Sequence, residues 1–188
     1  MAVIDTVDAR GRILDVTAAL VLEHGVAGVA QRQIAEQVGI KAASLYHHFG
    51  SKNEIVKAVF RQGIDVMENA WDEAAAAATG ADPRTRLATH IRAHLSALFE
   101  NGPYTAAHVT AFRTAPAEVR RAVVPMRDAY EARWTHLLSD LNLVDQPGLH
   151  RLTLFGAMNS SVEWFDTERG NLDELAEVIT TQFWGRTP

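Results

Sequence analysis

The chain of 188 residues contains no cysteine, which excludes several kinds of site at once. Disulfides, iron–sulfur clusters, thiolate zinc sites and a cysteine nucleophile all require that residue. No stretch approaches the roughly 18 apolar residues that a membrane-spanning helix needs, so no membrane partner is expected. The first residues, MAVIDTVDARGR, include acids and lack an apolar segment, which argues against a secretory signal. These absences favour a cytoplasmic protein.

Sequence motifs for catalysis and metal binding are also missing. The chain has no G-x-S-x-G elbow, no glycine-rich phosphate loop and no paired-carboxylate motif. His90 and His94 stand one helical turn apart, a spacing that can hold zinc, but Ile91 occupies the position where a zinc protease has its glutamate base. We therefore predict no catalytic residue, no metal site and no cofactor. An all-α metal-binding protein or enzyme that uses His90 and His94 is the least favoured alternative.

Basic residues are fewer than acidic ones, 18 against 23, which gives a formal net charge of −5. This balance argues mildly against a surface that binds nucleic acid everywhere. The excess of acidic residues is unevenly distributed along the chain, because residues 1–60 hold six Lys or Arg and six Asp or Glu. The acidity therefore belongs to residues 61–188. A neutral N-terminal region can bind DNA only through individual, well-placed side chains.

Apolar residues recur at three- and four-residue spacings along nearly the whole chain, and no segment alternates as a strand does. The pattern predicts an all-α fold of about nine helices, separated by glycine, proline and capping residues. Pro125 is expected to kink its helix or delay its start. The predicted helices cover about residues 10–24, 31–38, 42–48, 52–71, 83–100, 103–114, 117–141 and 147–166, and a last one starts at Asn171.

Residues 31–48 have the pattern of two short helices joined by a tight turn at Gly39, which is typical of a helix-turn-helix. The second helix of this motif needs an apolar edge that docks on the protein and an outward edge that binds bases or phosphates. Leu45 and Phe49 provide the apolar edge. The outward edge consists of Lys41, Ser44, Tyr46, His47 and His48.

This region resembles the TetR/AcrR family of bacterial transcriptional repressors. The shared residues are Ile34-Ala35, Gly39-Ile40, Leu45-Tyr46-His47-His48-Phe49 and Ser51-Lys52. The resemblance covers about residues 10–58. It implies a three-helix DNA-binding domain over residues 1–58 and a helical-bundle domain for effector binding and dimerisation over residues 59–188. It also implies a repressor, not an enzyme, that binds a palindromic double-stranded DNA operator as a homodimer.

By position, the resemblance implies that Tyr46 and Lys52 contact DNA phosphates while Ser44 and His47 face the major groove. Ala30 and Lys41 stand where the family usually has a capping Ser or Thr, and a lost cap costs about 0.5–2 kcal/mol. The base sequence of the operator therefore remains open. The predicted DNA-binding residues are Lys41, Ala42, Ser44, Tyr46, His47, His48 and Lys52.

The resemblance also implies an effector pocket, and the helices between residues 83 and 141 offer apolar walls with a few polar tips. The predicted effector-binding residues are Phe99, Tyr104, His108, Phe112, Met126, Tyr130 and Trp134. Residues 159–171, NSSVEWFDTERGN, resemble a stretch of regulators of fatty-acid and steroid breakdown, some of which respond to acyl-CoA thioesters. This favours a bulky, largely apolar small-molecule effector. The main alternative is an activator or constitutive DNA-binding regulator of the same fold, without a working effector site.

The resemblance further implies that the last two helices pair with their copies in a second chain. Gly156 and Ser160 are small enough to let two helices approach closely, and apolar residues flank them. The predicted dimer interface consists of Leu152, Phe155, Gly156, Ser160, Trp164, Leu175, Ile179 and Phe183. The alternative, in which both helices pack only within one chain, stays open at this point.

Overall fold

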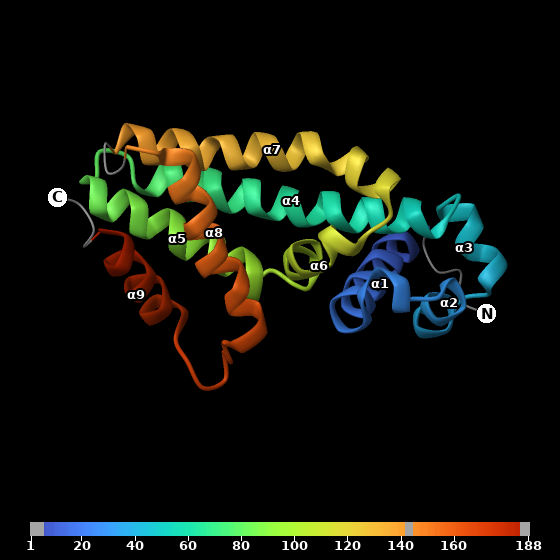
Figure 1. Cartoon of the computed structure of the whole chain (residues 1–188). Helices are drawn as coiled ribbons and strands as arrows, with labels where there is room; N and C mark the ends of the chain where they lie inside the picture. Colours follow the sequence, from blue (N-terminus) through green and yellow to red (C-terminus); the bar gives the residue numbers. More distant parts are fainter. Residues whose placement is uncertain (1–5, 142–144, 185–188) are drawn as a thin grey trace. The chain divides into compact units, whose positions relative to one another are not determined.

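The computed structural model describes residues 6–141 and 145–184, and over these residues the chain is helical and contains no strand. Its helices are α1 (Thr6–Gly28), α2 (Gln31–Val38), α3 (Ala42–His48), α4 (Lys52–Ala77), α5 (Pro83–Phe99), α6 (Tyr104–Ala111), α7 (Ala117–Asp140), α8 (Pro147–Trp164) and α9 (Leu172–Trp184), with a single 3-10 turn, η1 (Phe112–Thr114) (Figure 1). The predicted all-α fold is thereby confirmed. No helix in these residues is long and apolar enough to cross a bilayer.

The chain divides into two compact units. Unit 1 comprises the residues up to Ile64 together with Pro103–Pro125, and unit 2 comprises Asp65–Gly102 with the residues from Met126 onward. Helices α4 and α7 each contribute to both units. The predicted DNA-binding domain, residues 1–58, falls within unit 1, which also includes α6 and the start of α7.

Local signals in the sequence set most helix ends. Gly39 ends α2 in the left-handed conformation, with a φ of 77°, which costs glycine little. The side chain of Asp82 caps α5 by accepting a hydrogen bond from the Thr85 amide. Ser51, before α4, accepts from the amide of Glu54 at 3.2 Å, but the Glu54 carboxylate pairs with Lys57, so only one of the two hydrogen bonds of a capping box forms.

Helix α4 extends beyond the limit expected from the sequence. It continues to Ala77, past residue 71, because its end is an alanine run and alanine has the highest helix propensity. In α1 the backbone is non-helical at Gly25, with a φ of 68°, so the regular helix stops where the sequence predicts and a short helical piece follows to Gly28. Helix α7 begins at Ala117 and includes Pro125, so the expected delay of its start does not occur.

Each unit has its own core. In unit 1, α1 packs mainly on α6 and α2. In unit 2, α5 packs against α8 and α9, and an aromatic cluster forms the centre. We call this set the aromatic centre; it consists of Trp71, His90, His94, Tyr130, Trp134 and Phe155, with neighbouring ring centroids 4.3–6.3 Å apart.

Candidate nucleic-acid interface and ligand cavity

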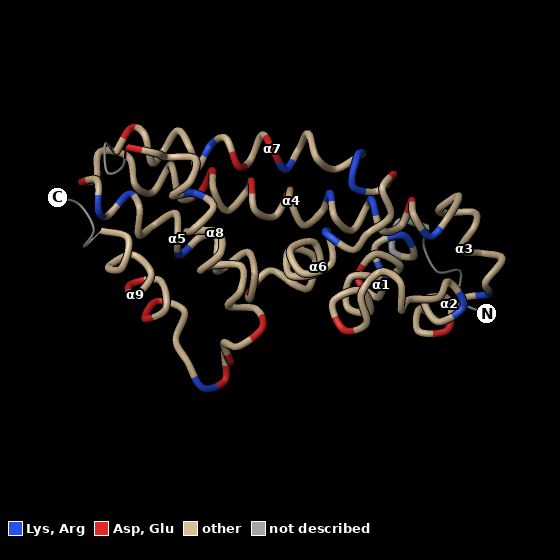
Figure 2. Tube along the Cα trace, in the orientation of Figure 1, with Lys and Arg blue, Asp and Glu red and all other residues tan. Residues whose placement is uncertain are grey.

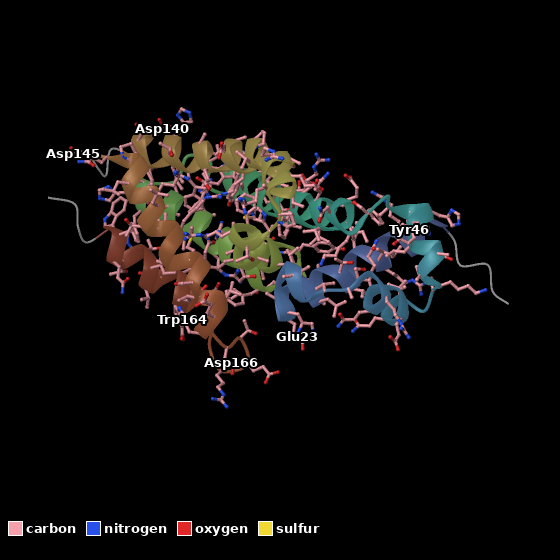
Figure 3. The ribbon with its side chains drawn as sticks, turned by 45° about the vertical axis from the view of Figure 1, so that its right-hand side comes forward. Glu23, Tyr46, Asp140, Asp145, Trp164 and Asp166 are labelled. Carbon is pink, nitrogen blue, oxygen red and sulfur yellow. The ribbon has the colours of Figure 1, made fainter. Side chains whose placement is uncertain are left out.

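Helix α3 turns one side towards the core of unit 1 and the other towards solvent. Leu45 and Phe49 are buried, whereas Tyr46 is 58% exposed (Figure 3). His47 and Lys41 are also exposed. The apolar and outward edges therefore lie where the helical period places them. Of the other predicted DNA-binding residues, Ala42 is exposed, and Ser44 and His48 are half-buried.

Arg10 of α1 fixes the C-terminal end of α3. Its Nη1 donates a hydrogen bond to the backbone oxygen of His48 at 3.0 Å, and its Cζ lies 4.1 Å from the centroid of the Phe49 ring. The last carbonyls of a helix have no partner inside the helix and carry partial negative charge, so a cation is favourable there. Because α3 has only seven residues, its orientation depends on such tertiary contacts.

Tyr46 is held by Gln31 of α2. The Tyr46 hydroxyl donates to Gln31 Oε1 at 3.1 Å, and the buried Gln31 Nε2 has no hydrogen-bond partner among the described residues. A half-turn of the Gln31 amide exchanges these atoms, so that Nε2 donates to the Tyr46 oxygen. The Tyr46 proton is then free to bind an outside acceptor such as a phosphate. Gln31 is therefore a positioning residue for Tyr46 that the sequence did not single out.

Lys52 links the start of α4 to the end of α1. Its half-buried Nζ donates to the backbone oxygen of Val29 at 2.7 Å. An ammonium group has three N–H donors, so two remain for other acceptors. Neither Ala30 before α2 nor Lys41 before α3 provides a side-chain cap, as the sequence indicates.

The charge on α2 and α3 is sparse. Figure 2 shows isolated basic positions there rather than a continuous basic strip. This agrees with the neutral balance of residues 1–60. Any affinity of this surface for DNA must therefore come from the placement of a few donors.

Three of the predicted effector residues lie in unit 1. His108 is buried, with its ring centroid 5.3 Å from those of both Phe60 and Phe112. The Tyr104 hydroxyl donates to the Asp15 carboxylate and so links α6 to α1. Burial and this carboxylate raise the pKa of the Tyr104 hydroxyl.

The other four predicted effector residues lie in unit 2, where the structure brings Tyr130 and Trp134 together in the aromatic centre. Both are buried. Phe99 packs instead on Phe165, with ring centroids 5.7 Å apart, and Met126 is half-buried. The seven residues thus do not form one set of neighbours.

His94 is the polar member at the middle of the aromatic centre. Its Nε2 lies 2.9 Å from Asn159 Oδ1, which can only accept, so Nε2 carries the proton. Its Nδ1 therefore accepts from the Tyr130 hydroxyl, also at 2.9 Å. Burial lowers the pKa of His94 to about 4, so the imidazole is neutral at pH 7.

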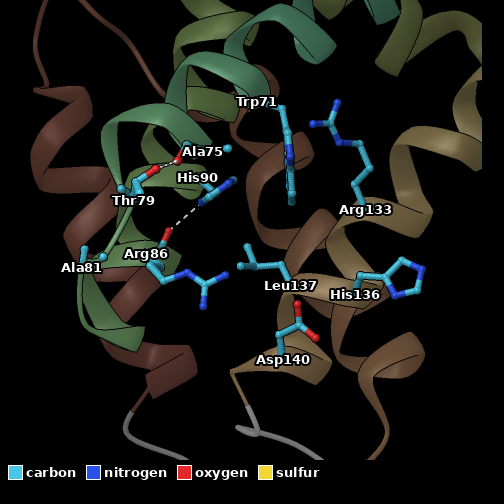
Figure 4. Close-up of a pocket in the computed structure, with 12 residues that line it drawn as sticks. Trp71, Ala75, Thr79, Ala81, Arg86, His90, Arg133, His136, Leu137 and Asp140 are labelled. Carbon is cyan, nitrogen blue, oxygen red and sulfur yellow. Dashed lines mark hydrogen bonds between the residues drawn. The ribbon is translucent and has the colours of Figure 1, made fainter.

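A cavity of about 520 Å³ lies in unit 2, at the turn between α4 and α5 and beside the end of α7 (Figure 4). Trp71, Ala78, His90 and Leu137 are its buried lining residues, and further small residues between Ala75 and Ala81 lie around them. None of the seven predicted effector residues lines it. Its polar lining consists of Thr79, Arg86, His90, Arg133, His136 and Asp140.

The two arginines of this cavity differ in their partners. Arg133 binds the carboxylates of Glu68 and Asp72, and its Cζ lies 5.1 Å from the centroid of the Trp71 ring. No carboxylate in the described part of the chain pairs with the Arg86 guanidinium, which is half-buried. Burial lowers the pKa of the neighbouring imidazole of His90, and so do the positive charges of both arginines.

The sequence named His90 only as half of a zinc pair with His94. The structure buries both histidines, and both ring nitrogens of His94 are hydrogen-bonded. No group of three or more potential metal ligands occurs within the described ranges. A signal for the cavity was present, because Arg86 and His90 are four residues apart and share a helix face.

The predicted dimer interface divides into exposed and buried residues. Leu152 and Trp164 of α8 are 55% and 60% exposed, and Gly156 and Ser160 are also exposed. Leu175 and Ile179 of α9 are buried within the chain, while Phe155 and Phe183 are half-buried. Leu149, which the sequence did not single out, and Val178 of the last helix add further exposed apolar surface to the two helices.

Comparison with known proteins places the chain among bacterial regulators. Residues 13–59 match the model of bacterial regulatory proteins of the tetR family, and residues 80–184 match that of the tetracyclin repressor-like C-terminal domain. The HTH-type transcriptional repressor KstR2 of Mycobacterium tuberculosis is 43% identical over 56 residues, which are 30% of this chain and 28% of that repressor. The chain thus spans little more than a quarter of the length of this relative.

Solved structures share the fold over nearly the whole chain. AibR in complex with isovaleryl coenzyme A and operator DNA has a TM-score of 0.79 at 19% identity, with 93% of this chain and 97% of that chain covered. The superantigen PfiT has a TM-score of 0.75 at 29% identity, with 95% and 97% covered. Such different descriptions show that the fold alone does not determine function.

The two family models together settle the identity at the level of the family. The C-terminal model alone spans residues 80–184, which is more than half of the chain. Both models describe regulatory proteins and not enzymes, in agreement with the lack of catalytic motifs. The chain belongs to the tetR family of bacterial regulatory proteins.

Proposed function

We propose that this protein is a ligand-responsive transcriptional repressor that binds a palindromic DNA operator as a homodimer. The observation that carries the proposal is the division of α3, which buries Leu45 and exposes Tyr46 and His47. In a helix-turn-helix the outward residues of the second helix enter the major groove. The match to the repressor KstR2 and the likeness to AibR, solved with operator DNA, support the same function.

The side chains have two kinds of role in this proposal. Tyr46 and Lys52 donate to phosphates and so fix the position of the protein on the duplex. Lys41, Ser44 and His47 reach base edges and so determine which sequence is bound. Ala42 and His48 complete the surface that lies in the groove.

Fluorescence anisotropy with the DNA that flanks its own gene tests DNA binding directly. Salt-sensitive binding that exceeds binding to a scrambled duplex of equal length is the expected result. Equal affinity for both duplexes would contradict the proposal. Specific binding that no small molecule releases would instead favour a constitutive regulator of the same fold.

The variants Tyr46→Phe and His47→Ala separate the two roles. Tyr46→Phe removes only the hydroxyl and is expected to weaken binding to all duplexes by about three- to tenfold, because one phosphate hydrogen bond is lost. His47→Ala is expected to change the preferred bases in a binding selection. Arg61→Ala is the control, since it removes an exposed charge from α4 outside the helix-turn-helix. An unchanged base preference in His47→Ala would show that His47 does not read the operator.

The proposed homodimer uses the exposed face of α8. Four of the six large exposed apolar residues in the described ranges lie on α8 and α9, namely Leu149, Leu152, Trp164 and Val178. A concentration of apolar surface on two neighbouring helices is typical of a protein–protein interface. A palindromic operator needs two α3 helices about one or more DNA turns apart, which a twofold dimer provides.

Leu152→Glu is expected to shift the dimer towards monomer by at least tenfold in dissociation constant, since it places a charge in the proposed interface. Analytical ultracentrifugation over a concentration series measures this shift. Thr153→Glu is the matched control, because it adds the same charge to the next exposed position of α8. If both substitutions have the same effect on dissociation, or if neither has an effect, the proposal that α8 forms the dimer interface is wrong.

Release from DNA requires two states of the protein and an effector that prefers one of them. An effector shifts this equilibrium only by its difference in affinity for the two states. Helix α4 is continuous from Lys52, in the proposed DNA-binding surface, to Ala77, whose neighbours Ala75 and Ala78 line the cavity. We therefore propose that α4 couples effector binding to operator binding. The proposed effector is a small, largely apolar molecule.

A further inference from the structure

We propose that the cavity between α4, α5 and α7 in unit 2 binds an organic monocarboxylate, with the carboxylate on Arg86 and an apolar or aromatic body on Trp71 and Leu137 (Figure 4). The inference rests on the proposed function in one respect, since it names the chemical class of the effector. The binding site itself can be tested without DNA.

The charge of the cavity favours one anionic group. Arg133 already binds two carboxylates, Glu68 and Asp72, so its charge is compensated. Arg86 pairs with no carboxylate in the described residues and lies at the same cavity. Its planar guanidinium can bind a carboxylate through two parallel hydrogen bonds. Burial is the main cause that lowers the pKa of His90, and the positive charges of both arginines lower it further.

His90 does not add a second donor for the anion. Its Nδ1 lies 2.7 Å from the backbone oxygen of Arg86, which only accepts, so Nδ1 donates there. The other nitrogen of the neutral ring is then an acceptor. Asp140, on the same lining, repels further negative charge. The second guanidinium of the lining, Arg133, is already compensated, and the second imidazole, His136, is exposed. One guanidinium without a carboxylate partner, beside a neutral imidazole and the Asp140 carboxylate, suits a single carboxylate better than the several phosphates of a nucleotide.

The remaining lining suits an apolar body. Trp71 and Leu137 provide apolar surface, and the small side chains of Ala75 and Ala78 leave space beside them. The Trp71 and His90 ring centroids are 4.3 Å apart at an angle of 59°, so the two rings form a continuous wall. A volume of about 520 Å³ lies within the range of about 300–1,000 Å³ found for small-molecule sites.

Isothermal titration calorimetry of the full chain with decanoate and with 4-phenylbutyrate, each paired with its own amide, tests the site. Each acid is expected to bind at least tenfold more tightly than its amide. Arg86→Met should weaken binding of the acids by about 10- to 100-fold and leave the amides unchanged, because a charge-assisted hydrogen bond is lost. Arg84→Met is the matched control, since it removes the same charge from α5 but does not line the cavity.

Equal affinities for acids and amides, no binding of either acid, or unchanged binding by Arg86→Met would overturn the inference. Decyl phosphate tests whether the site prefers a phosphate to a carboxylate. If decyl phosphate binds more tightly than decanoate, and Arg86→Met loses that binding, the site is a phosphate site and the carboxylate proposal is refuted. DNA binding is measured separately. If the protein binds the acids but does not bind its flanking DNA specifically, the proposed function is refuted and the carboxylate site is not. If it binds the operator but neither acid, only the carboxylate site is refuted.

Discussion

Acidification from pH 7 to pH 4.5 is expected to lower the free energy of unfolding by about 2 to 3 kcal/mol through His94 alone. The pKa of His94 is about 4 in the folded chain, below the ordinary value of 6.5. Between these values the unfolded chain binds more protons than the folded one, so stability decreases as the pH is lowered. The contribution is complete above pH 6.5 and is lost as the pH falls towards 4. Urea unfolding at a series of pH values measures it.

The hydrogen bonds of His94 explain why protonation of its imidazole is unfavourable in the folded protein. Protonation at Nδ1 would turn an acceptor into a donor facing the Tyr130 hydroxyl, which would have to rotate away. His94→Gln cannot titrate and is expected to lose most of the slope between pH 4.5 and 6.5. Some slope remains because the pKa of His90 is lowered too. A full slope in His94→Gln would disprove the assignment.

Features that depend on neighbouring residues were predictable from the sequence. The turn between α2 and α3 follows from Gly39, and the start of α5 follows from Asp82 and its proline. The two edges of α3 follow from the helical period, so the burial of Leu45 and the exposure of Tyr46 could be expected. A capping or periodicity signal acts within one or two helical turns, so these predictions require only residues that are close in sequence.

Contacts between distant parts of the chain were not predictable in the same way. Arg10 meets His48 across 38 residues, and Tyr46 meets Gln31 across 15. The effector prediction selected aromatic residues by type, but packing separated them: His108 joined the core of unit 1 and Trp134 the centre of unit 2. The cavity forms where α4, α5 and α7 meet, and the residue spacing within a single helix does not specify how three helices meet.

Gly63→Ala is expected to destabilise the protein by about 1 to 3 kcal/mol, because α4 and α6 approach each other at this glycine. A Cβ at Gly63 would lie 2.6 Å from the backbone oxygen of Tyr104 and 2.9 Å from its carbonyl carbon. Backbone atoms cannot rotate away as a side chain can, so α6 must shift. The Thr105 hydroxyl, which donates to the Gly63 oxygen at 3.1 Å, would lose its geometry. Thermal unfolding and amide exchange in α6 measure the effect.

Gly11→Ala provides the matched control because it makes the same chemical change in a helix with nothing within 4 Å of the new Cβ. There the substitution should stabilise the protein by about 1 kcal/mol, since alanine favours the helix over glycine. Helix propensity acts in the same direction at both positions, so only the contact with Tyr104 can reverse the sign. Stabilisation by Gly63→Ala, with unchanged amide exchange in α6, would mean that α4 and α6 do not meet at this distance. Opposite signs for the two variants would identify Gly63 as the residue that lets α6 dock against α4.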